Sequence, residues 1–192
     1  MNKTRLEAFS DAVIAIIMTI MVLELKIPHG ADLEALKPLL PVFLAYVLSF
    51  IYIGIYWNNH HHMLQATRKV NGKVLWANLF LLFWLSMVPF ATGWMGENHF
   101  APLPTAIYGV VLLLCAISYT ILQNKITKHR DGENELLTKA VGSDIKGKLS
   151  LLFYIVAIPM AFVNQSISDA LYVAVALIWF IPDRRIEKVM DK

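Results

Sequence analysis

Long blocks of residues without a charged side chain restrict most strongly how this 192-residue chain can fold. Four such blocks cover residues 39–57, 74–95, 100–124 and 149–168. At about 1.5 Å per helical residue, each is long enough to cross a bilayer core of roughly 30 Å. Hydrophobic residues make up 57% of the chain and charged residues only 16%, and such a composition needs lipid to cover its apolar surface. We therefore expect an all-α integral membrane protein.

Two further blocks, at residues 12–23 and 170–182, are shorter and need flanking residues to complete a crossing. If the chain crosses at all six blocks, 15 of the 17 lysines and arginines fall on one side, and only Lys26 and Lys37 on the other. The positive-inside rule then places both termini in the cytoplasm. We predict one membrane domain over residues 1–192, with helices at about 5–27, 39–66, 73–96, 100–128, 147–165 and 168–183.

The first of these helices is poorly suited to face lipid. Glu7 and Asp11 precede its short apolar centre and Glu24 follows it. A carboxylate at membrane depth costs several kcal/mol unless it meets a partner or water. We therefore expect this helix to lie centrally and to line a wet path, which requires several copies of the chain because one helix encloses no pore.

One face of the first helix carries Ile16, Thr19, Ile20 and Leu23, at helical spacings of three and four residues. Around a symmetry axis, aliphatic side chains of this size form a constriction that blocks ions by dewetting, and a ring of threonine hydroxyls can replace part of an ion's hydration shell. The same spacing is also that of an ordinary packing stripe, in which Thr19 bonds back to its own helix. Spacing alone favours the packing stripe.

Polar residues gather where the first two helices reach the cytoplasmic side. Arg5, Ser10 and Asp11 lie at a depth similar to that of Trp57, Asn58 and His60, so we expect hydrogen bonds between the two helices. The run His60–His62 invites a metal site, but consecutive helical residues point about 100° apart, so the three rings cannot bind one ion. We expect no metal site, cofactor or catalytic centre, and the scattered basic residues do not suggest nucleic acid.

Two special residues in the spans are expected to act on helix packing. Pro89 lies inside the third predicted helix and should kink it. Gly54 in the second is expected to allow a neighbouring helix to approach closely. Cys115 is the only cysteine, so no disulfide forms within the chain.

The motif Arg5-x-x-x-Phe9-Ser10-Asp11 at the start of the first helix, with Trp57-x-x-His60 at the end of the second, resembles the transmembrane protein 175 family of potassium channels. The resemblance implies a leak-type, potassium-permeable homotetramer in the plasma membrane of a prokaryote, and the sequence contains no T-V-G-Y-G filter. It also implies a hydrophobic constriction at Ile16, a selectivity layer at Thr19 and narrow rings at Ile20 and Leu23. The implied network that holds the first helix consists of Arg5, Phe9, Ser10, Asp11, Trp57, Asn58 and His60.

An alternative hypothesis is a proton-coupled secondary transporter that uses Asp11 and His60 as a proton relay, because ionisable groups inside a membrane often serve transport. Transporters usually show internal repeats and interrupted helices near the midplane, and neither is evident in this sequence. Saturable counterflow with strict pH coupling would distinguish the transporter from the channel.

Overall fold

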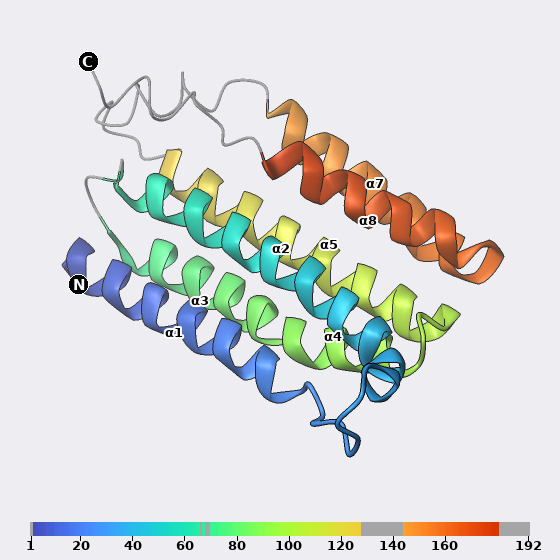
Figure 1. Cartoon of the computed structure of the whole chain (residues 1–192). Coiled ribbons are helices and arrows are strands. Elements are labelled where there is room, and N and C mark those ends of the chain that lie inside the picture. Colours follow the sequence, from blue (N-terminus) through green and yellow to red (C-terminus); the bar gives the residue numbers. More distant parts are fainter. Residues whose placement is uncertain (1, 66, 68–69, 128–143, 181–192) are drawn as a thin grey trace.

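The computed structural model describes residues 2–65, 67, 70–127 and 144–180, and in this part of the chain all regular structure is helical. The helices lie side by side along a common direction (Figure 1). They are α1 (Lys3–Leu23), the 3₁₀ helix η1 (Leu33–Leu39), α2 (Leu40–Gln65), α3 (Gly72–Ser86), α4 (Val88–Glu97), α5 (Pro102–Thr127), α7 (Ile145–Val163) and α8 (Gln165–Phe180).

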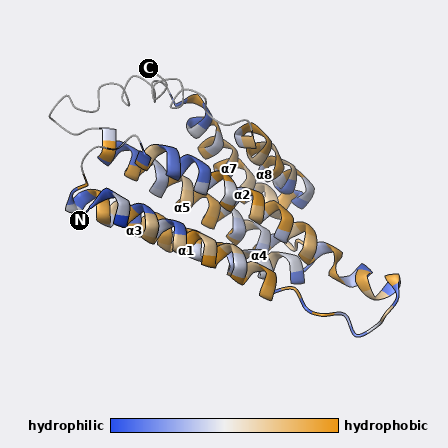
Figure 2. Ribbon diagram, turned by 60° about the vertical axis from the view of Figure 1, so that its left-hand side comes forward, coloured by the Kyte–Doolittle hydropathy of each residue, from blue (hydrophilic) through white to orange (hydrophobic). Residues whose placement is uncertain are grey.

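Within the described ranges, five segments are long and apolar enough to cross a membrane: α1, η1 with α2, α3 with α4, α5 and α7. The sixth, α8, has 16 residues, about 24 Å of helix, so it needs adjoining residues to complete a crossing of roughly 30 Å. Figure 2 shows hydrophobic residues along most of each helix and hydrophilic residues near the N-terminal end of α1 and the adjacent end of α2. The chain is a multi-pass membrane protein. Residues 128–143, between α5 and α7, and residues 181–192, after α8, lie outside the described residues.

Polar side chains cap the starts of α1, α3 and α7. An asparagine or aspartate immediately before a helix accepts a hydrogen bond from one of the first backbone amides, which have no partner inside the helix. This pairing joins Asn2 to Thr4, Asn71 to Val74 and Asp144 to Gly147.

The third predicted helix, at about 73–96, is divided into α3 and α4 at Met87. Pro89 follows the break, and because proline has no amide hydrogen it cannot bond to the carbonyl of Leu85, four residues earlier. The first helix also ends earlier than predicted, at Leu23 rather than near residue 27, and Glu24 occupies its C-cap position.

The prediction for Gly54 is wrong within the subunit, because a Cβ atom at this position would meet no heavy atom within 4 Å. Close approach occurs instead at Gly96, where an added Cβ would lie 2.7 Å from the Cα of Val42 in α2, and at Gly109, which packs against the Tyr172 ring of α8.

Within one subunit α1 lies at the edge of the bundle, against α2, α3 and α4 (Figure 1). Helix α5 packs against α3, α4, α7 and α8. The side of α1 that faces the bundle carries Leu6, Ser10, Ile14, Ile17 and Met21, all buried. The first helix therefore takes a central place only when several subunits assemble around it.

Candidate pore face and its anchoring network

The side of α1 turned away from the bundle carries Ile16, Thr19, Ile20 and Leu23, which we call the outward face. Ile16 is 56% exposed, Ile20 is 42% exposed and Leu23 is 80% exposed. Thr19 is exposed between them. The opposite side of α1 is buried inside the subunit. The residues that pack α1 against the bundle are therefore those of the buried side and not those of the outward face. The outward face is free to meet other copies or a pore.

The hydroxyl of Thr19 donates its hydrogen to the backbone oxygen of Ile16, over 2.9 Å. With the hydrogen engaged, the lone pairs of Oγ1 are left to face outwards, and lone pairs are what a cation requires.

Asp11 and Trp57 are directly linked across α1 and α2. The indole Nε1 of Trp57 donates to Oδ1 of Asp11 over 3.0 Å, so the carboxylate near the N-terminal end of α1 has a charge-assisted partner. Trp57 is still 45% exposed, and its ring stacks on that of His61 with 6.1 Å between the centroids. The link therefore lies at the surface of the subunit.

Ser10 and His60 are joined through Asn78 of α3. Nδ2 of Asn78 donates to Oγ of Ser10 over 2.9 Å, and Oδ1 of Asn78 lies 2.7 Å from Nε2 of His60. All three residues are buried, with exposed fractions of 1% or less. This Ser10–Asn78–His60 chain ties together α1, α2 and α3.

Sequence reasoning missed Asn78. The signal for it was a single amide in the uncharged stretch of the third predicted helix, since a buried amide in a membrane needs partners. Two residues of the predicted network are not part of it within one subunit. In the described part of the chain, neither the Arg5 guanidinium nor the Asn58 amide makes a side-chain hydrogen bond or ion pair. Phe9 is 46% exposed.

The three consecutive histidines point to different neighbours. The ring of His60 turns to Asn78, that of His61 stacks on Trp57, and His61 and His62 meet edge to face at 5.6 Å. Over the described ranges there is no group of three or more histidine, cysteine, aspartate or glutamate side chains placed to hold a metal ion.

At the opposite end of α1, Lys26 pairs with Glu97 of α4 over 2.6 Å. The hydrogen bond with the Glu97 carboxylate, and then its charge, raise the pKa of Lys26. Both side chains are largely exposed, so the pair is screened by solvent and adds little to stability.

The family model of the endosomal/lysosomal potassium channel TMEM175 matches residues 5–89, which contain α1, α2, α3 and the start of α4. A potassium channel from Chryseobacterium sp. (strain P1-3) is 57% identical over 192 residues and covers 100% of both chains. The chain belongs to the TMEM175 family of potassium channels. A potassium channel from Streptomyces collinus is 30% identical over 188 residues, covering 92% of this TMEM175 chain and 91% of that one.

The fold of this TMEM175 chain is also similar to a solved structure. The crystal structure of a lysosomal potassium-selective channel TMEM175 homologue from Chamaesiphon minutus superimposes with a TM-score of 0.79 at 26% identity. The match covers 94% of this chain and 97% of that one. Sequence and structure thus agree on the family, and its members are channels rather than enzymes.

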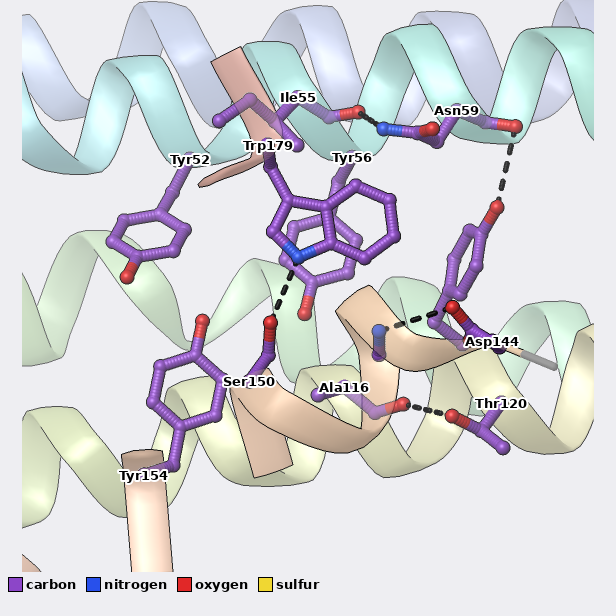
Figure 3. Close-up of a pocket in the computed structure, with 12 residues that line it drawn as sticks. Tyr52, Ile55, Tyr56, Asn59, Ala116, Thr120, Asp144, Ser150, Tyr154 and Trp179 are labelled. Carbon is purple, nitrogen blue, oxygen red and sulfur yellow. Dashed lines mark hydrogen bonds between the residues drawn. The ribbon is translucent and has the colours of Figure 1, made fainter. Parts of the chain in front are cut away.

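A pocket between α2, α5, α7 and α8 is separate from the outward face of this TMEM175 subunit (Figure 3). Its volume of about 40 Å³ fits about three or four waters at roughly 10–15 Å³ each. Trp179 closes one side, where its Nε1 donates to Oγ of Ser150 over 2.8 Å. Neither Asp11 nor His60 lines it, so it does not connect the two residues of the transporter hypothesis. The aromatic side chains of the wall include Tyr52, Tyr56, Tyr119 and Tyr154.

Proposed function

We propose that four copies of this chain assemble with their α1 helices around a common axis and conduct K⁺ along the outward faces. The observation that carries the proposal is the division of α1 into a buried side, which holds it in the subunit, and an exposed side made of Ile16, Thr19, Ile20 and Leu23. Lipid can cover aliphatic side chains, but the exposed Glu24 carboxylate at the end of α1 needs a partner or water at membrane depth, so lipid is a poor cover for this face. A closed cyclic assembly covers it with the same face of other copies.

In this assembly three aliphatic rings, from Ile16, Ile20 and Leu23, follow one another over about 10 Å of helix. Such rings stop water and ions from passing unless they widen, which makes this segment the gate. The Thr19 ring between them offers oxygen lone pairs because its hydrogen is bonded to Ile16. Selectivity for K⁺ therefore arises at Thr19 and at the width of the Ile16 ring, without a T-V-G-Y-G filter.

The residues at the cytoplasmic end act as the anchor of the pore helix. Asp11 bonds to Trp57 of α2, and Ser10 reaches His60 of α2 through α3. These bonds fix the position of α1 against the remainder of the subunit. Arg5, Phe9 and Asn58 complete the network by contacts between subunits, since Arg5 and Phe9 are exposed in one subunit.

The distribution of basic residues supports a plasma membrane location in a prokaryote, with both termini in the cytoplasm. The permeant ions are K⁺ and, less readily, other monovalent cations. A transporter that relays protons between Asp11 and His60 is not favoured, because the family consists of channels.

The test is ion flux into liposomes that contain the purified protein, under K⁺ and under Na⁺ gradients. We expect flux down a K⁺ gradient that exceeds flux down an equal Na⁺ gradient. Ile16→Asn should raise conduction and lower the K⁺/Na⁺ ratio, because an amide wets the constriction.

The matched control is Ile155→Asn in α7, because Ile155 is 57% exposed and Ile16 is 56% exposed, but Ile155 lies on a helix that does not pack against α1. It should leave conduction and selectivity as in the wild type. Equal effects of the two substitutions, or no effect of Ile16→Asn, would show that the pore is elsewhere.

A further inference from the structure

Asn78 occupies a site between three helices that only a residue with both a donor and an acceptor can satisfy. It is completely buried in α3, with Oγ of Ser10 on one side and Nε2 of His60 on the other. Because Nδ2 is used on Ser10, the atom that faces His60 is the acceptor Oδ1.

This arrangement selects one form of the His60 ring. Its Nδ1 is buried and has no hydrogen-bond partner in the described part of the chain. A proton on Nδ1 would leave a buried N–H donor unpaired, whereas a proton on Nε2 leaves only a lone pair unpaired, which proteins tolerate more often. The Oδ1 of Asn78 also needs a donor, so both requirements place the proton on Nε2.

We propose that Asn78 is a positioning residue for the pore. Its amide holds His60 as the neutral Nε2–H tautomer and keeps Ser10 hydrogen-bonded to α3. Together these bonds fix the rotation of α1 about its axis. At about 100° per residue, Ser10 and Ile16 lie about 120° apart around α1. A rotation of α1 that releases Ser10 therefore turns the outward face away from the axis. This inference rests on the proposed function, in which α1 lines the pore.

The charged and titratable groups that face His60 are Asp11 and Glu7 on α1 and His61 on α2. On α3 the only charged side chain is Lys73, five residues before Asn78. Exchanging Asn78 for aspartate would place a carboxylate at hydrogen-bond distance from Nε2 and would remove the donor to Ser10. It therefore favours the imidazolium form of His60 and makes the anchor depend on pH.

The first experiment is NMR on the full-length protein labelled with ¹⁵N-histidine. The resonances of His60 are identified by their loss in His60→Gln, and they should show the neutral Nε2–H tautomer at neutral pH. In Asn78→Leu, which offers no acceptor, the signals should become those of a mixture. An Nδ1–H tautomer in the wild type would overturn the proposal, as would an unchanged tautomer in Asn78→Leu. If Asn78→Leu does not fold, an unchanged protonation state of His60 in Asn78→Asp would overturn it instead.

The second experiment measures K⁺ flux in liposomes against pH for Asn78→Asp. Its matched control is Asn59→Asp, because Asn59 is also buried but, in the described part of the chain, its side-chain amide bonds only to the backbone oxygen of Ile55 in its own helix. We expect Asn78→Asp to lower the K⁺/Na⁺ ratio and to give flux a pH dependence that His60→Gln abolishes, while Asn59→Asp keeps the wild-type profile.

A wild-type pH profile and selectivity in Asn78→Asp, or equal changes in the two aspartate variants, would refute the positioning role. Absence of K⁺ flux in the wild type would instead refute the proposed function, and the NMR result would still decide whether Asn78 sets the tautomer of His60.

Discussion

The packing of α4 against α2 leaves no room for a side chain at Gly96, so Gly96→Ala should destabilise the protein. A Cβ added at Gly96 would lie 2.7 Å from the Cα of Val42. Carbon atoms prefer about 3.5–4.0 Å, so the two helices must separate by about 1 Å in Gly96→Ala. Overpacking of this kind costs about 1–3 kcal/mol. Because Gly96 lies in the last turn of α4, the gain in helix propensity offsets little of that cost.

Gly54→Ala is the matched control, since the new methyl group would meet no heavy atom within 4 Å and Gly54 lies in the interior of α2. There the higher helix propensity of alanine should stabilise the protein by roughly 0.5–1 kcal/mol. Unfolding of both variants in detergent, followed by circular dichroism, should show midpoints that shift in opposite directions. The reasoning is refuted if Gly96→Ala is as stable as the wild type, or if both substitutions destabilise equally.

Three smaller predictions follow from single contacts. Thr19→Val keeps the side-chain shape but removes the oxygen, so the K⁺/Na⁺ permeability ratio from reversal potentials should fall while conduction persists; an unchanged ratio would exclude a selectivity layer there. Trp57→Phe removes the donor to the Asp11 carboxylate and should lower the free energy of unfolding by about 1–2 kcal/mol, which an unchanged denaturation midpoint would contradict. Lys26→Met should leave the melting temperature unchanged at any pH below about 10. The raised pKa of Lys26 keeps the lysine charged over this range, but solvent screens its exposed pair with Glu97, and a clear drop in melting temperature would show that the pair is not screened.

Much of the fold follows from the sequence because a bilayer imposes simple rules on length and charge. Uncharged blocks long enough to cross lipid predict the helices, and the family motif in α1 and α2 predicts a potassium channel. The division of the third helix at Met87 depends on Pro89, which the sequence shows, but a proline can either bend or interrupt a helix according to its neighbours.

The contacts of the polar side chains were harder to predict. Similar depth suggested that Ser10 and Asp11 pair with α2, and Asp11 does bond to Trp57 directly. The partner of Ser10 is on α3, because the order in which helices pack around α1 is a tertiary property that depth does not determine. For the same reason, spacing gave no indication that Gly96 and not Gly54 would be the point of close helix contact.

The most direct test of the central claim, that the outward face of α1 lines the ion path, is chemical modification of single cysteines. Cys115 is fully buried, so the native background is low, and Cys115→Ala removes it. A cationic thiol reagent should block K⁺ flux through Leu23→Cys, since Leu23 is on the outward face. It should not block K⁺ flux through Val22→Cys or Met21→Cys. Val22 is 46% exposed but lies on another side of α1, and Met21 is only 2% exposed. Block at Val22→Cys with none at Leu23→Cys would contradict the account.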